Sequence, residues 1–168
     1  FAEYRNWIIA RLLIDTGARI GELLEVEATD IDIRNGALLL RKTKSKKERV
    51  VYFSSKMGRS FKSWLEYKDR YSDSPFVFPS TRGNKMDIRN IEAAFRKHGR
   101  LVGVDVHPHQ LRNNFAKYYL LNGGDWLTLS RILGHSSVEV TQKAYLDFSD
   151  QEIGQKYKRH SPLNNLDI

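Results

Sequence analysis

The chain has 168 residues and no cysteine, and 40% of its residues are apolar and 29% charged, which excludes a disulfide scaffold, a thiolate metal site and a disordered chain. This length fits one domain that buries its own core. Lysine plus arginine number 28 against 20 for aspartate plus glutamate, so the net charge is +8. Such a surplus favours a polyanionic partner, most commonly nucleic acid, although a basic surface also serves solubility alone.

No stretch approaches the roughly 18 apolar residues of a membrane span, and no signal peptide is visible. We therefore expect no membrane partner and a cytoplasmic location. The chain opens at Phe1, without a methionine, next to residues that already follow a helical pattern. This opening predicts a piece of a longer protein whose upstream region is absent.

The first 53 residues predict two helices and then a small antiparallel sheet. Apolar residues at helical spacing predict a helix over 2–15, which Gly17 ends, and a short helix follows over 19–26. Residues 42–48 read as a cationic hairpin tip between two strands. The expected strands are 31–33, 37–40 and 50–53.

The rest of the chain predicts helices separated by one long loop. Prolines and glycines over 72–84 indicate that loop, with a short strand at 76–78. The tail over 158–168 is expected to be extended. The expected helices are 61–68, 87–101, 109–121, 125–133, 136–146 and 149–157. The apolar residues expected to face a core include Trp7, Ile8, Leu12 and Ile14, and later Leu111, Phe115 and Tyr118. The predicted fold class is α+β, mainly α-helical with one small antiparallel sheet.

Charged residues stand at the start of two predicted helices. Arg19 precedes Glu22 by three residues, which alone suits a surface ion pair. His109 precedes Arg112 by three residues after Pro108, where a helix N-terminus favours anions; alone this suits a capping histidine and a solvated arginine. His107 and His109 resemble a metal pair, but no third ligand is spaced nearby.

A second histidine and a tyrosine lie further on. Leu133-Gly134-His135 puts a histidine in a glycine turn between two predicted helices, and Tyr145 follows ten residues later. A tyrosine in an amphipathic helix is usually a core or rim residue. In combination, two arginines, two histidines, a hairpin lysine and a tyrosine are the parts that phosphoryl transfer needs, since it depends on positioning and charge stabilisation.

These segments together, in this order and at this spacing, resemble the signature boxes of the tyrosine recombinase (phage integrase) family. The resemblance covers about residues 3–150 and implies the catalytic-domain fold of that family. It implies a catalytic DNA breaking-rejoining domain over 1–157 and a C-terminal tail over 158–168, with an upstream DNA-binding domain missing. The matching segments are Thr16 to Leu24, His109-Gln110-Leu111-Arg112, Leu133 to Ser136, Tyr145 and the basic hairpin Thr43 to Arg49.

The resemblance implies a role for each matched residue. Arg19 and Arg112 hold the scissile phosphate, and Tyr145 is the nucleophile. His109 and His135 hydrogen-bond the phosphate and assist proton transfer.

Three further assignments follow from the same resemblance. Lys44 is the general acid for the leaving 5′ oxygen, although neighbouring lysines allow its register to slip. Glu22 matches an acidic position that orients neighbouring site residues. The DNA-contacting residues of the hairpin are Lys42, Lys46, Lys47 and Arg49.

The implied activity is site-specific DNA recombination through a covalent 3′-phosphotyrosine, for integration or excision. No metal is implied, because the matched arginines, lysine and histidines supply the charges and hydrogen bonds that the reaction needs. No nucleotide is implied, because the phosphotyrosine stores the energy of the broken bond. The implied partners are double-stranded DNA and further copies of the chain, as a tetramer on paired sites, with residues 159–168 docking between protomers. Two alternatives stay open: a type IB topoisomerase-like enzyme and a catalytically silent DNA-binding remnant. The intact set of matched residues argues against the remnant.

Overall fold

The computed structural model describes residues 1–41, 48–145 and 148–161, without the side chains of residues 144 and 145. The chain divides into two compact units, Phe1–Phe115 (unit 1) and Ala116–Ile168 (unit 2). One catalytic domain over residues 1–157 stays a prediction.

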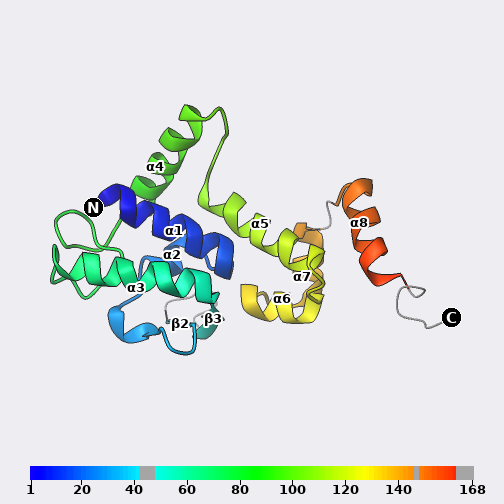
Figure 1. Cartoon of the computed structure of the whole chain (residues 1–168), viewed down its shortest axis with the longest axis horizontal. Helices are drawn as coiled ribbons and strands as arrows, with labels where there is room; N and C mark the ends of the chain where they lie inside the picture. Colours follow the sequence, from blue (N-terminus) through cyan, green and yellow to red (C-terminus); the bar gives the residue numbers. More distant parts are fainter. Residues whose placement is uncertain (42–47, 146–147, 162–168) are drawn as a thin grey trace. The chain divides into compact units, whose positions relative to one another are not determined.

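Unit 1 is built mainly from helices, and α1 packs beside α3 (Figure 1). Helix α1 ends where Gly17 adopts a left-handed conformation with φ 64°. A Cβ atom on Gly17 would lie 2.3 Å from the Phe115 ring, so both the backbone and the packing require glycine there. The helices in or entering unit 1 are α1 (Ala2–Thr16), α2 (Ile20–Leu23), α3 (Ser55–Asp69), α4 (Ile88–Leu101) and α5 (Pro108–Leu121).

The predicted antiparallel sheet is confirmed, with strand order β1-β2-β3. Residue Leu38 pairs with Val51, and both are buried, so one face of the sheet turns to the core of unit 1. A short 3₁₀ helix, η1 (Ala28–Asp30), leads into the sheet. The strands are β1 (Ile31–Asp32), β2 (Ala37–Leu40) and β3 (Arg49–Tyr52).

The strand predicted over 76–78 is wrong. Phe76 forms an isolated bridge with Glu27, and the Val77 N–H donates to the Val26 carbonyl at 2.9 Å. Pro75 and Pro79 flank this segment, and a proline has no N–H to continue a ladder.

The core of unit 1 contains the buried face of α1 and the buried aromatic rings of α3. Trp64 is fully buried, and its indole N–H donates to the Val77 carbonyl at 2.9 Å. The expectation that Trp7 and Ile14 face this core is wrong, since each is 47% exposed. They lie on the opposite side of α1 from its buried residues, which recur at the 3.6-residue period. The buried residues of α1 are Arg5, Asn6, Ile8, Ile9, Leu12, Leu13 and Thr16.

Unit 2 contains the end of α5, then α6 (Trp126–Leu133), α7 (Val138–Tyr145) and α8 (Asp150–His160). Helices α6 and α7 pack together over Leu129 and Leu133, which are fully buried. Asp125 caps α6, because its carboxylate accepts the Thr128 N–H at 2.8 Å. Tyr118, expected in a core, is 62% exposed.

Helix α8 has no buried residue. An ion pair between Lys117 and Glu152, at 2.8 Å, links it to α5 within unit 2. The extended tail predicted from residue 158 is wrong as far as His160, where the helix ends. Basic residues in this last turn interact favourably with the negative end of the helix dipole. Among the helices that the structure describes, none has the length and apolar content needed to cross a bilayer.

Candidate active site

The turn between α1 and α2 presents Arg19. This residue precedes the first turn of α2 with extended backbone angles, and the Glu22 carboxylate accepts its backbone N–H at 2.9 Å. The same carboxylate pairs with Arg19 Nη1 at 3.0 Å. The predicted pair therefore forms, but Glu22 is only 4% exposed, so it is a buried carboxylate with a definite geometry rather than a surface contact.

A second arginine reaches the same carboxylate from the sheet. Arg49, the first residue of β3, donates from Nη1 to Glu22 Oε1 at 2.6 Å and from Nη2 to Oε2 at 2.8 Å. Burial raises the pKa of Glu22, but the hydrogen bonds and charges of Arg49 and Arg19 outweigh burial and leave that pKa below its ordinary value. Glu22 is thus an ionised carboxylate shared by two arginines.

Sequence reasoning missed the Arg49–Glu22 pair. The two residues are 27 positions apart, and no local spacing connects them. The DNA contact expected of Arg49 stays a prediction, while the structure directs both of its terminal nitrogens to Glu22.

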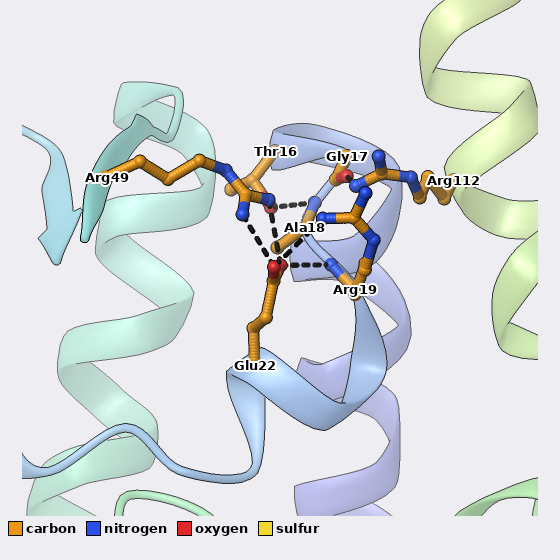
Figure 2. A network of polar contacts seen from close by, with 7 residues as sticks. All are labelled: Thr16, Gly17, Ala18, Arg19, Glu22, Arg49 and Arg112. Carbon is orange, nitrogen blue, oxygen red and sulfur yellow. Dashed lines mark hydrogen bonds and ion pairs between the residues drawn. The ribbon is translucent and has the colours of Figure 1, made fainter. Parts of the chain in front are cut away.

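Arg112 reaches the Arg19 turn from helix α5. Its side chain is buried, with 3% exposure, and Nη1 donates to the Gly17 carbonyl at 2.5 Å. Figure 2 shows Arg112, from a separate helix, beside the turn that carries Arg19. His109 lies one helical turn before Arg112 on α5 and is exposed. Unit 1 therefore assembles two predicted phosphate-binding arginines at one backbone turn, with a predicted histidine on the same helix as one of them.

The local sequence explains why the turn holds its shape. The Thr16 hydroxyl donates to the Leu12 carbonyl at 2.7 Å and accepts the Ala18 N–H at 3.2 Å. Together with the glycine conformation at residue 17, these bonds satisfy backbone groups that the helix end leaves open. The carbonyl of Gly17 is left facing Arg112.

Unit 2 positions the other predicted histidine. His135 follows Gly134, which ends α6 with φ 65°. Its Nδ1 atom lies 2.8 Å from the Thr141 hydroxyl, and Thr141 is fully buried in α7. This contact fixes the orientation of the imidazole ring. Sequence reasoning missed Thr141, because its contact with His135 depends on the packing of α7 against α6.

The remaining predicted site residues fall outside the described part. Tyr145 is the last residue of α7, and its side chain is not described. The hairpin residues Lys42, Lys44, Lys46 and Lys47 also lie outside the described residues. Among the side chains that are described, no group of three or more His, Asp or Glu residues is placed to hold a metal ion.

Comparison with known proteins identifies the family. The model of the phage integrase family matches residues 1–152. The chain belongs to the phage integrase family. The tyrosine recombinase XerA of Pyrococcus furiosus is 31% identical over 167 residues, covering 98% of this chain and 57% of that protein. The tyrosine recombinase XerC of Corynebacterium glutamicum is 30% identical over 160 residues, covering 94% of this chain and 51% of that protein.

Solved structures agree with this membership. The crystal structure of XerA recombinase superposes with a TM-score of 0.86 at 32% identity, over 95% of this chain and 59% of that one. XerH recombinase bound to a palindromic difH substrate superposes with a TM-score of 0.76 at 22% identity, over 97% of this chain and 47% of that one, which shows a shared fold. The mainly helical fold with a small sheet is thus the fold of tyrosine recombinase catalytic domains. The chain spans about half the length of these relatives, from 47% to 59%.

Proposed function

We propose that this chain is the catalytic part of a site-specific DNA recombinase that cleaves and rejoins strands through a 3′-phosphotyrosine. The observation that carries the proposal is the convergence of Arg19 and Arg112 on the Gly17 turn in a member of this family. Arginine binds phosphate oxygens through paired donors, and donors held by buried bonds need no reorganisation during a reaction.

In the proposed reaction, the Tyr145 hydroxyl oxygen attacks the scissile phosphorus while the bond from phosphorus to the 5′ oxygen breaks. The phenol proton passes to a base, for which His109 and His135 are the candidates. Lys44 gives a proton to the leaving 5′ oxygen. A free tyrosine has a pKa of about 10, so only about 0.1% is phenolate at pH 7, and the cations Arg19 and Arg112 favour attack by stabilising the charge on the nonbridging oxygens.

The 5′-hydroxyl of a partner strand then attacks the phosphotyrosine and regenerates the tyrosine. Because one phosphodiester replaces another, the cycle requires no nucleotide. In this proposal Glu22 orients Arg19, as its two hydrogen bonds to that residue support. Lys42, Lys46 and Lys47 contact the DNA backbone.

The proposed partners are double-stranded DNA and further copies of the chain. XerH bound to difH substrate and a lambda integrase dimer bound to a core site share this fold. We propose a tetramer on two paired sites, joined through residues 159–168. Deleting residues 162–168 leaves α8 complete, because that helix ends at His160. Two-site assembly is expected to fall while single-site cleavage persists; unchanged assembly would contradict the role of the tail.

A nicked duplex tests the proposed chemistry. The full gene product is incubated with duplexes that tile the DNA flanking its gene, each nicked a few nucleotides beyond a candidate cleavage position. Loss of the short released strand traps the covalent complex, which survives denaturation and is mapped by peptide mass spectrometry. Attachment is expected at Tyr145, and Tyr145→Phe is expected to bind DNA without forming the adduct.

Each other outcome has a defined meaning. Attachment at Tyr118, Tyr119 or Tyr157 would show that the assignment of Tyr145 as the nucleophile is wrong. Sequence-specific binding without any adduct would indicate the silent remnant. Relaxation of supercoils without a second site would indicate a topoisomerase.

A further inference from the structure

The Arg49–Glu22 pair joins the sheet of unit 1 to the turn that carries Arg19. Both terminal nitrogens of Arg49 bond separate oxygens of Glu22, and the two side chains are 12% and 4% exposed. One of those oxygens, Oε1, also bonds Arg19 Nη1 at 3.0 Å. The other, Oε2, accepts the Arg19 backbone N–H. Figure 2 shows this carboxylate between the two arginines.

Stability alone is a weak reason for such an arrangement. A buried ion pair is often no more stabilising than apolar residues of similar volume, because both charges lose their water. Removal of one partner is costly, since the other charge is left buried without compensation. The pair is therefore expected to serve a purpose at its location, and its location is the residue proposed to bind phosphate.

The charges around Arg19 suggest that purpose. If Glu22 had Arg19 as its cation, the carboxylate would neutralise Arg19 and draw its guanidinium inward, away from a substrate phosphate. Arg49 supplies a second positive charge and the tighter bidentate geometry, at 2.6 and 2.8 Å against 3.0 Å for Arg19. The group formed by Glu22, Arg19 and Arg49 carries a net charge of +1.

We propose that Arg49 is a positioning residue that acts through Glu22: it satisfies the carboxylate, so that Glu22 orients Arg19 while Arg19 keeps its charge for the scissile phosphate. This inference rests on the proposed phosphate-binding role of Arg19. It differs from a DNA-backbone contact, for which Arg49 has to leave a buried bidentate pair.

The principal test is Arg49→Met, which keeps a long apolar stem and removes the charge. Cleavage of the nicked duplex is measured in single turnover at saturating protein. The rate is expected to fall about tenfold, less than the roughly 10²–10³ lost when an oxyanion donor is removed outright. Arg49→Lys, which keeps the charge without the fork, is expected to lose less. Adding Glu22→Gln to Arg49→Met is expected to restore part of the rate, because the unsatisfied carboxylate is then gone.

A substrate with a methylphosphonate at the scissile position identifies the route. Replacing one nonbridging oxygen with methyl removes the negative charge that Arg19 is proposed to meet. The loss caused by Arg49→Met is therefore expected to shrink to less than about threefold on this substrate, as is the loss caused by Arg19→Ala. An equal loss on both substrates would overturn the proposal.

Arg41→Met provides a matched control. Arg41 follows the same sheet and pairs with Asp30, a buried carboxylate, at 2.5 Å. The Arg41–Asp30 pair is therefore another arginine bound to a buried carboxylate of unit 1. Unlike Glu22, Asp30 is not the carboxylate proposed to orient Arg19. Arg41→Met is expected to lower the melting temperature and to leave the ratio of the two cleavage rates unchanged.

Three further results separate the explanations. A parallel loss of duplex affinity and rate in Arg49→Met, with a weaker salt dependence, would make Arg49 a backbone contact. Rescue by sulfur at the bridging 5′ position would place its effect on the leaving group, since a thiolate leaves without a proton. A crystal structure of Arg49→Met is expected to show Arg19 turned fully onto Glu22. If Arg19 has not moved in that structure, the proposal for Arg49 is wrong, whether or not the wild-type chain forms an adduct. Failure of the wild-type chain to form an adduct would by itself contradict only the proposed function.

Discussion

Units 1 and 2 hold their candidate catalytic side chains in different ways. In unit 1, Arg112 and Glu22 are almost fully buried and are fixed by short charged hydrogen bonds. In unit 2, His135 is half-buried and its Nδ1 atom contacts the Thr141 hydroxyl, while α8 has no buried residue. The charged residues Arg112 and Glu22 are thus part of the buried interior of unit 1, whereas His135 lies in the turn between two short helices, α6 and α7.

This difference in burial predicts how substitutions in each unit affect stability and cleavage. Buried charged groups contribute to the fold as well as to the site, because removing one partner leaves the other without compensation. A half-buried group contributes little to the fold. Changes to the buried charged groups of the candidate site in unit 1 are therefore expected to alter stability and cleavage together, and changes at the half-buried histidine of unit 2 to alter cleavage alone.

The two arginines provide the largest expected effect. Arg19→Ala and Arg112→Ala are each expected to slow cleavage by roughly 10²–10³, as does removal of an oxyanion donor. Only Arg112→Ala is expected also to lower the free energy of unfolding clearly, because its side chain is 3% exposed and that of Arg19 is 31% exposed. Urea unfolding and single-turnover cleavage measure the two quantities. Equal free energies of unfolding for the two variants would contradict the expectation that burial makes a site residue of unit 1 contribute to stability.

Much of this arrangement follows from local sequence. Gly17 ends a helix because it tolerates positive φ, and the Asp125 carboxylate caps one because it accepts a backbone N–H. Such signals predict most helices and the antiparallel sheet. The resemblance to the tyrosine recombinase family selects Arg19 and Arg112, whose local spacing alone suits a surface ion pair and a solvated arginine.

Long-range packing is what the sequence does not reveal. Trp7 is apolar yet exposed, because the stripe through Ile8 and Leu12 already fills the core. Arg49 reads as one more basic residue of a hairpin until β3 places it beside Glu22. Thr141 is likewise visible as a partner of His135 only once α6 and α7 pack together.

The next effect concerns the backbone of the Arg19 turn. Gly17→Ala is expected to cost about 1–2 kcal/mol for the left-handed backbone, and more for the contact at 2.3 Å with the Phe115 ring. Gly103→Ala is the control, because Gly103 has φ 71° and nothing within 4 Å of an added Cβ. Thermal unfolding is expected to rank the wild type above Gly103→Ala and Gly17→Ala last. Equal losses would mean that the ring moves aside freely.

A smaller effect is expected at the histidine of unit 2. Thr141→Val keeps the shape of the buried residue and removes the hydroxyl beside His135 Nδ1. One hydrogen bond contributes about 1 kcal/mol, so cleavage is expected to slow about fivefold, with a shifted pH-rate profile because the imidazole loses its orienting partner. Thr128→Val, on the exposed side of α6, is the control. A loss of stability with an unchanged pH profile would make Thr141 a packing residue only.

The smallest effect distinguishes α8 from the core of unit 1. Gly154 lies inside α8, and an added Cβ there meets nothing within 4 Å. Alanine is favoured over glycine in a helix interior by about 0.8–1 kcal/mol, so Gly154→Ala is expected to strengthen α8. Because α8 has no buried residue, this gain is expected to stay local: its amide hydrogens exchange about fourfold more slowly, while the melting temperature of the whole chain stays unchanged.

Gly58→Ala is the contrasting variant in α3, where the added Cβ approaches the Phe53 ring at 3.4 Å in the core of unit 1. Its effect is expected to appear in the global transition. A change in the melting temperature of the whole chain in Gly154→Ala would show that α8 unfolds together with the core. In that case α8 would not differ from unit 1 in this respect.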